Sequence, residues 1–172
     1  MLRTVLTLIL CTALAAQLAA QRAPTAGIVA RYGWGPTGRI DDAFGIGLEL
    51  EAFPGSVLVP SARLDHWNFG ITCLEFVSCP SGVTTFAVGA KYRLLGETAV
   101  TPYAGGDIGY MSWTSDVSGL SLRLRAGADI RVVRHIDLNM DGSFTRYVRS
   151  QGQGRMLERQ LIGISGGLKL WL

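Results

Sequence analysis

Fifteen charged side chains recur at alternate positions and are the largest set of residues in the chain that could do chemistry. Eight are bases and seven are acids, so the charges nearly balance. Buried charges must be paired and hydrogen-bonded, so near balance favours a structural ion network, with a selective pore as the functional alternative. The set comprises Arg31, Glu49, Glu51, Arg63, Asp65, Lys91, Arg93, Asp107, Arg123, Arg125, Asp129, Arg131, Asp137, Asp141 and Lys169.

The two histidines, His66 and His135, are the other candidates for catalysis. Nucleophilic catalysis needs a histidine within reach of a hydroxyl or an acid. His66 follows Asp65, but successive side chains of a strand point to opposite faces. The segment from His66 to Asn68 also lacks the Phe-His-x-Ser motif of lipid A deacylases. We therefore expect no catalytic residues and no enzyme activity, and keep a lipid-modifying enzyme as an alternative.

The first 21 residues have the features of a Sec export signal. Met1-Leu2-Arg3 is a short basic region, Val5 to Ala16 is an apolar stretch, and Leu18-Ala19-Ala20-Gln21 offers small residues for cleavage. We expect residues 1–21 to be removed as a signal peptide. Residues 22–172 would then form one domain, because roughly 150 residues suit a single domain.

Removal of this signal, with its Cys11, would leave two cysteines, Cys73 and Cys79. An even count in an oxidising compartment favours pairing, so a disulfide between them is predicted. Two thiols without a nearby histidine or a further cysteine do not complete a tetrahedral metal site. No metal and no other cofactor is expected.

Alternation with period two dominates the chain after residue 25, as strands with two different faces require. Between Leu120 and Val132, seven apolar residues alternate with Ser121, Gly127 and four charged residues. Phe44 to Ala52 repeats the pattern, with glycine and glutamate on the second face. Six further strands are predicted, which makes eight in all, at residues 26–34, 57–66, 83–94, 100–112, 136–147 and 159–172.

The connections between these strands alternate in length. The longer ones lie at 35–42, 67–82, 113–119 and 148–158, and the shorter ones at 53–56, 95–98 and 133–135. Transmembrane barrels have long extracellular loops and short periplasmic turns. The pattern predicts an all-β fold, an eight-stranded antiparallel up-and-down transmembrane β-barrel with both termini on the periplasmic side.

Alternation does not say which face points inward, and a soluble lipocalin-like periplasmic binding barrel would place the same leucines inside. Two features favour an apolar outer face. Glycines fall mostly on the charged face, where they leave room for long side chains in a narrow lumen. Aromatic residues near strand ends suit the interface girdles of a membrane barrel. They are Tyr32, Trp34, Phe44, Phe53, Tyr92, Tyr110 and Trp171.

Two segments carry a resemblance to a known family. Pro102-Tyr103-Ala104-Gly105-Gly106-Asp107-Ile108-Gly109-Tyr110 resembles a Pro-Tyr, Gly-x-x-x-Gly-Tyr strand, and Gly167-Leu168-Lys169-Leu170-Trp171-Leu172 resembles a C-terminal assembly signal. Leu172 departs from that signal, which usually ends in an aromatic residue. The mature chain as a whole resembles the small outer-membrane β-barrel proteins of the OmpA/OmpX and opacity type. The resemblance implies the outer membrane as location and the barrel-assembly machinery as partner of the C-terminal strand.

The expected function is that of an envelope structural or surface-interaction, adhesion-like protein with a plugged, charge-paired lumen. Outer-membrane lipid and lipopolysaccharide are expected partners, because lipopolysaccharide phosphates suit arginine. An extracellular partner would meet the loops, of which residues 67–82 are rich in apolar side chains. Nucleic acid is excluded because the bases are interspersed with acids. The arginines that would bind lipopolysaccharide phosphates are Arg146, Arg149, Arg155 and Arg159.

Overall fold

The computed structural model describes residues 24–36, 42–70, 82–95, 98–113, 118–151 and 160–172. The predicted signal peptide, residues 1–21, and the predicted disulfide partners, Cys73 and Cys79, lie outside these ranges. Within them, no helix is long and apolar enough to cross a membrane. The strands are β1 (Thr25–Trp34), β2 (Asp42–Glu51), β3 (Leu58–Gly70), β4 (Gly82–Arg93), β5 (Val100–Trp113), β6 (Ser118–Val133), β7 (Ile136–Gln151) and β8 (Gln160–Trp171).

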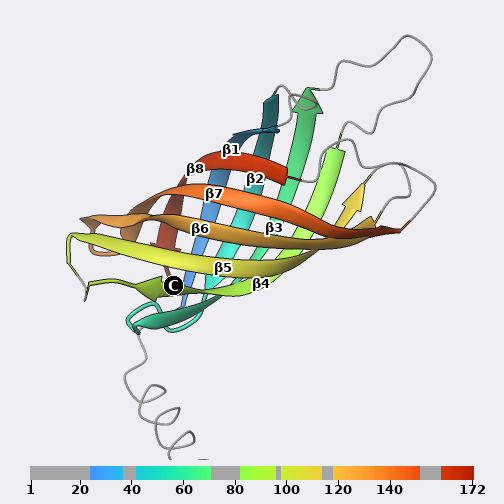
Figure 1. Cartoon of the computed structure of the whole chain (residues 1–172). Coiled ribbons are helices and arrows are strands. Elements are labelled where there is room, and N and C mark those ends of the chain that lie inside the picture. Colours follow the sequence, from blue (N-terminus) through green and yellow to red (C-terminus); the bar gives the residue numbers. More distant parts are fainter. Residues whose placement is uncertain (1–23, 37–41, 71–81, 96–97, 114–117, 152–159) are drawn as a thin grey trace, which may run out of the picture.

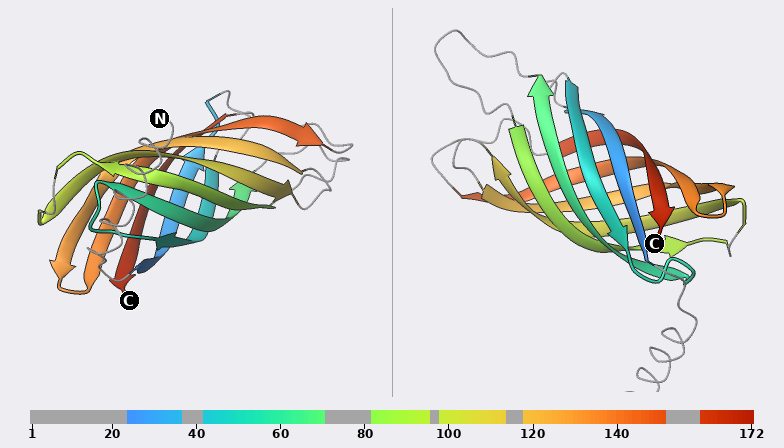
Figure 2. Two further views of the ribbon diagram at one scale, coloured as in Figure 1. Left: turned by 90° about the horizontal axis from the view of Figure 1, so that it is seen from below. Right: turned by 180° about the vertical axis from the view of Figure 1, so that it is seen from behind.

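The eight strands form one closed barrel in which each strand pairs with its neighbour in sequence (Figure 1). Every pairing is antiparallel, and β8 returns to pair with β1, so no strand edge stays open. The tilted, twisted strands wind around the barrel, as the two further views show (Figure 2). This confirms the predicted fold class, an eight-stranded up-and-down antiparallel β-barrel.

Two strands run further than the sequence pattern predicted. β3 extends to Gly70 and β7 to Gln151, where strand ends at 66 and 147 were expected. Trp67 and Phe69, which we expected in a loop, pair with Gly45 and Ala43 of β2. The alternation continues through these two aromatic side chains, but without charged residues it was not recognised as strand.

The short turns lie at the same end of the barrel as the first and last described residues, Pro24 and Leu172. Turns between β2 and β3, between β4 and β5, and between β6 and β7 lie at the end where Leu172 N donates to Pro24 O at 2.9 Å. In the first turn, Phe53 has a positive φ of 52°, and the Ser56 hydroxyl donates to its carbonyl oxygen at 2.8 Å. The predicted arrangement of short turns and termini at one end is therefore present.

The barrel wall has an apolar outside and a polar inside. Leu124 is 68% exposed and Phe44 61%, whereas Asp65 and Lys91 are fully buried. A soluble barrel would need the opposite arrangement, because its core must remove apolar side chains from water. The lipocalin-like alternative is therefore wrong, and the closed barrel has the lipid-facing surface of a transmembrane protein.

Candidate functional site in the barrel lumen

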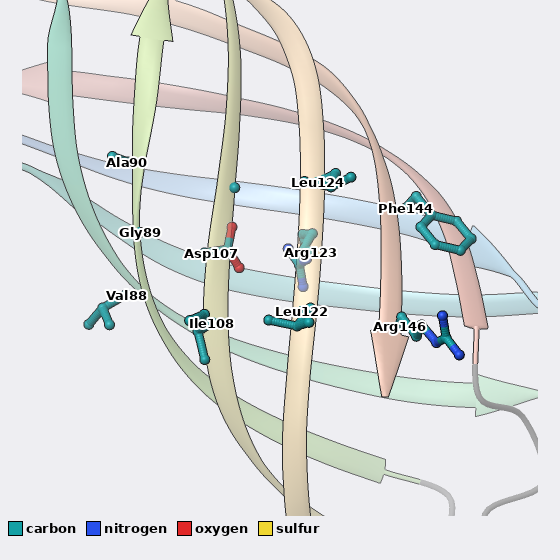
Figure 3. A pocket seen from close by; sticks show the side chains of 11 residues that line it. Val88, Gly89, Ala90, Asp107, Ile108, Leu122, Arg123, Leu124, Phe144 and Arg146 are labelled. Atoms are coloured by element: carbon teal, nitrogen blue, oxygen red, sulfur yellow. The ribbon is translucent and has the colours of Figure 1, made fainter. Parts of the chain in front are cut away.

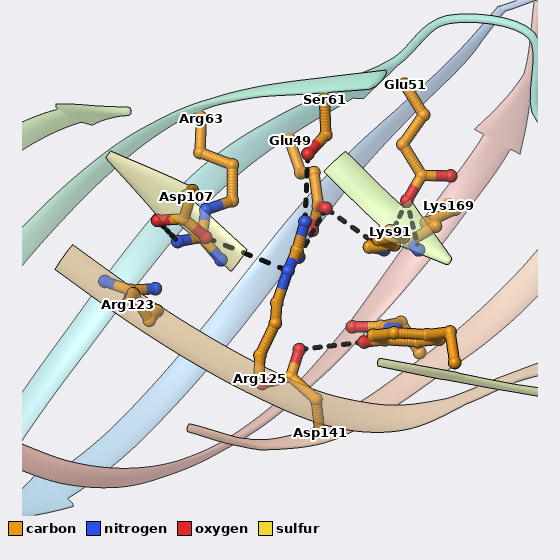
Figure 4. A network of polar contacts seen from close by, with 12 residues as sticks. Glu49, Glu51, Ser61, Arg63, Lys91, Asp107, Arg123, Arg125, Asp141 and Lys169 are labelled. Carbon is orange, nitrogen blue, oxygen red and sulfur yellow. Dashed lines mark hydrogen bonds and ion pairs between the residues drawn. The ribbon is translucent and has the colours of Figure 1, made fainter. Parts of the chain in front are cut away.

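The structure places all fifteen predicted charged residues on the lumen side of the barrel wall. Fourteen of them are buried, and the exception is Arg131, whose side chain is 32% exposed. All eight strands contribute to the set, so only barrel closure brings these side chains together. Figure 4 shows part of this network.

Asp65, on β3, contacts three arginines near the loop end of the lumen. Arg31 Nε donates to Asp65 Oδ1 at 3.0 Å, and Arg123 Nη2 donates to Asp65 Oδ2 at 3.2 Å. Arg63 Nε lies 3.9 Å from Asp65 Oδ2. The carboxylate fits because Gly47 faces it on β2: a Cβ there would lie 2.1 Å from Asp65 Oδ1. A single acid thus holds cations from three strands.

Arg125, on β6, connects this cluster with the centre of the lumen. Its Nη1 donates to Glu49 Oε1 at 2.7 Å, and its Nη2 donates to the Ser61 hydroxyl at 2.9 Å. Arg125 Nε lies 3.8 Å from Asp107, which also accepts a hydrogen bond from Arg63 at 2.8 Å. Figure 4 shows Arg125 reaching across the lumen toward Glu49. Planar guanidinium groups suit such multiple contacts with carboxylates.

Two lysines form the next cluster toward the turn end. Lys91 donates to Glu51 and lies 3.1 Å from Glu49 Oε1. Lys169 donates to Glu51 at 2.7 Å and to Asp129 at 2.6 Å. Each lysine thus contacts two carboxylates, which offsets the cost of burying the ammonium groups.

Tyr103 is a lumen residue that the sequence analysis missed. Its ring is 1% exposed, and Lys91 Nζ lies 4.5 Å from the ring centre, a cation–π distance. Its hydroxyl donates to Asp141 at 3.0 Å and accepts a hydrogen bond from Asn139 at 2.8 Å. The sequence did carry a signal for it: Tyr103 lies an even number of residues before Asp107, so the two side chains share a strand face.

Trp171 lies at the turn end of the network, and its predicted place in an interface girdle is wrong. It was assigned to an interface girdle, but its side chain turns toward the lumen: the indole Nε1 donates to Asp137 Oδ2 at 2.9 Å. Arg131 lies over the indole ring at 4.7 Å and binds Asp137 at 3.1 Å. Trp171 shares a face with Lys169, two residues earlier, so the strand period decides its direction.

An apolar layer fills the lumen at the loop end, where the sequence suggested no core. It contains Trp67, whose indole packs on Gly45: a Cβ there would lie 2.9 Å from Trp67 Cδ2. Arg123 lies 6.0 Å from the Trp67 ring centre, so the apolar layer adjoins the ion network directly. Its buried members are Ala43, Trp67, Phe69, Val83, Met111, Tyr147 and Leu161.

His66 lies outside the lumen, on the outer face of β3. Its Nδ1 is 3.0 Å from the Thr84 hydroxyl on β4, while the neighbouring Asp65 points inward. Thr84 as partner was not foreseen, because it depends on the register between β3 and β4. Across the described ranges, no three His, Cys, Asp or Glu side chains are arranged to hold a metal ion.

The predicted arginine cluster of the last loop is only partly described. Arg146 belongs to β7, within the strand predicted at residues 136–147, and its side chain is exposed on the outer face. Arg149, which we expected in the loop, also belongs to β7. Arg155 and Arg159 lie outside the described residues. The extension of β7 therefore moves Arg149 from the predicted loop into a strand.

No protein-family model and no curated relative matches the sequence. Solved structures do match. A crystal structure of Neisserial surface protein A, NspA, aligns with a TM-score of 0.62 at 11% identity, covering 87% of this chain and 96% of that one. The outer membrane protein OprG from Pseudomonas aeruginosa aligns with a TM-score of 0.55 at 10% identity, covering 87% and 93%. The chain has the fold of the small outer-membrane β-barrels.

This match confirms the fold that the sequence resemblance implied. The outer membrane enzyme PagL also aligns, with a TM-score of 0.51 at 12% identity, covering 85% of this chain and 99% of that one. A surface protein and an enzyme thus share this architecture. Because a fold hosts many functions, the activity must be argued from the residues of this barrel.

Proposed function

We propose that this chain is a non-conducting outer-membrane barrel that serves as an envelope structural or surface-interaction protein and not as an enzyme. The packing of the lumen carries this proposal. Paired charges fill its middle, from Asp65 to Lys169, and an apolar layer around Trp67 and Phe69 fills the loop end. Eight-stranded barrels have an interior just wide enough for side chains, which leaves no path for hydrated ions.

The proposed partners follow from this architecture. The exposed apolar belt would contact outer-membrane lipid, and β8 would be the strand that the barrel-assembly machinery engages. A surface partner would meet the loop end. That NspA is a surface protein supports this role, although the likeness itself is one of fold.

Planar-bilayer recording tests the closed lumen. The purified mature protein should give no stable conductance steps in about 1 M salt, while a trimeric porin added to the same chamber should give them. The ion network should not open under voltage, because separating its buried pairs leaves uncompensated charges. Large, long-lived channels from this protein alone would contradict the proposal.

The enzyme alternative deserves a direct test because PagL shares the fold. His66 has a hydroxyl partner in Thr84, but no carboxylate in the described ranges contacts it. Mass spectra of lipid A should therefore be identical for cells that produce the wild type, the His66→Ala variant or no protein. Loss of an acyl chain that depends on His66 would establish an enzyme instead.

A further inference from the structure

A hollow of about 610 Å³ lies on the outer face of the barrel wall across β4, β5, β6 and β7 (Figure 3). Two adjacent rows of paired residues form it. Ala90, Gly106, Leu124 and Phe144 make one row. Val88, Ile108, Leu122 and Arg146 make the next. The wall sinks at Ala90 and Gly106, because these two residues carry almost no side chain between larger neighbours.

The lining suits an alkyl chain. Val88, Ile108 and Leu124 are all more than half exposed on the lipid side, and the hollow has the volume of a small-ligand site. A hollow in a lipid-facing wall must be filled by chains of the surrounding lipid. What this hollow adds is a fixed shape and a charged residue at one end.

Arg146 lies at the end of the hollow opposite β4 (Figure 3). It is exposed on the outer face, and no acid in the described part of the chain pairs with it. With strands tilted by about 40°, each residue rises roughly 2.5 Å along the barrel axis. The ten steps from Ile136 to Arg146 therefore cover about 25 Å, the height of the apolar band. The guanidinium group thus lies at the membrane interface of the loop end.

Among the described residues Arg146 has no charge partner, and the membrane at this level offers one. The loop end faces outside, because short turns and termini are periplasmic in such barrels. The outer leaflet offers phosphate groups attached to acyl chains, and arginine binds phosphate through two parallel hydrogen bonds. We propose that this hollow binds one acyl chain of lipid A while Arg146 pairs with a lipid A phosphate.

Native mass spectrometry of the mature protein with added lipid A tests the site. Bis-phosphorylated, hexa-acylated lipid A should bind more tightly than the same lipid without phosphates. Arg146→Gln should weaken binding of the phosphorylated lipid about tenfold, as loss of a charged hydrogen bond predicts. Arg134→Gln, which removes an exposed arginine at the turn end, should leave binding unchanged.

A second pair of variants tests the hollow itself. Gly106→Leu should fill it and reduce binding of both lipid forms; a Cβ there would lie 3.2 Å from Arg123 O, so a side chain needs only a small adjustment. Gly142→Leu is the matched control, because a Cβ at Gly142 has no heavy atom within 4 Å and Gly142 lines a different hollow. Heat-modifiable migration on gels would show that each variant is folded.

Three results would overturn the proposal. The first is equal binding of the phosphorylated and phosphate-free lipid by the wild type, which requires no variant to fold. The second is an equal loss of binding in Arg146→Gln and Arg134→Gln. The third is equally tight, equally Arg146-dependent binding of phosphatidylglycerol, which would assign the hollow to phospholipid.

Discussion

Asp65 holds more cations than any other residue of the lumen for which contacts are described. Its carboxylate contacts Arg31, Arg63 and Arg123, and its side chain is fully buried. Asp137, at the turn end, pairs instead with the partly exposed Arg131. Both residues are carboxylates, but the cations around Asp65 are buried, whereas the cation that pairs with Asp137 is partly exposed.

The Asp65→Asn variant should lower the free energy of unfolding by about 3 to 5 kcal/mol, because it leaves buried cations uncompensated. Asp137→Asn should cost less, about 1 kcal/mol, since its partner Arg131 is partly exposed and water screens that charge. Urea titration of the protein folded in lipid vesicles measures both. Equal losses in the two variants would mean that the network is solvated throughout.

Gly47 shows how a missing side chain positions a charged one. A Cβ at this position would overlap Asp65 Oδ1, so Gly47→Ala must push the carboxylate away from Arg31 and Arg123. We expect a loss of about 2 kcal/mol, in the range of other disrupted buried networks. Gly142→Ala, on the outer face, should change stability by less than about 0.5 kcal/mol. The same urea titration compares them, and a neutral Gly47→Ala would show that Asp65 has room to move.

The elements of this protein are two-faced strands, and the faces have opposite tolerance for charge. Leu124 lies in the middle of β6 on the lipid side, whereas Leu95 lies in the turn after β4, and both are exposed. Leu124 therefore lies at the depth of the lipid chains, whereas Leu95 lies at the interface with water.

Leu124→Arg should destabilise the barrel by about 2 to 4 kcal/mol, because a charge near the bilayer midplane has no partner. Leu95→Arg should cost about 0 to 1 kcal/mol, since the turn lies at the interface. Unfolding in lipid vesicles again gives the difference. If both variants were equally stable, the outer face of β6 would be facing water.

At the scale of the whole molecule, closure is what makes an apolar outside stable. All strands pair on both sides, so no backbone edge is left open to lipid, where an unpaired N–H or C=O group is costly. The lumen charges in turn need the closed wall, since partners such as Arg125 and Glu49 come from strands on different sides of the barrel.

The mature protein should fractionate with the outer membrane and migrate faster on gels when it is not boiled. Both follow from a closed, lipid-embedded barrel that stays folded in detergent. Membrane fractionation followed by paired boiled and unboiled lanes provides the measurement, with a periplasmic protein as fractionation control. Recovery in the soluble periplasmic fraction would contradict the membrane assignment.

The amino-acid sequence alone was enough to predict the strands and which residues share a face. Period-two alternation is a local property, so Leu124 and Arg125 could be assigned to opposite faces without any knowledge of the neighbouring strands. It was sufficient for the strand number, the antiparallel order and all fifteen lumen charges. It failed where the lumen face carries no charge, at Trp67 and Phe69, because an apolar side chain gives the same signal on either face.

Which groups contact one another could be read only from the folded barrel. Barrel closure and register bring Asp65 to Arg123, Tyr103 to Asp141 and His66 to Thr84, across separations that no spacing in the sequence encodes. The same register aligns Ala90, Gly106 and Arg146 into one hollow on the outer wall. The physical reason is that strand pairing fixes contacts perpendicular to the chain, whereas the sequence pattern describes only the direction along it.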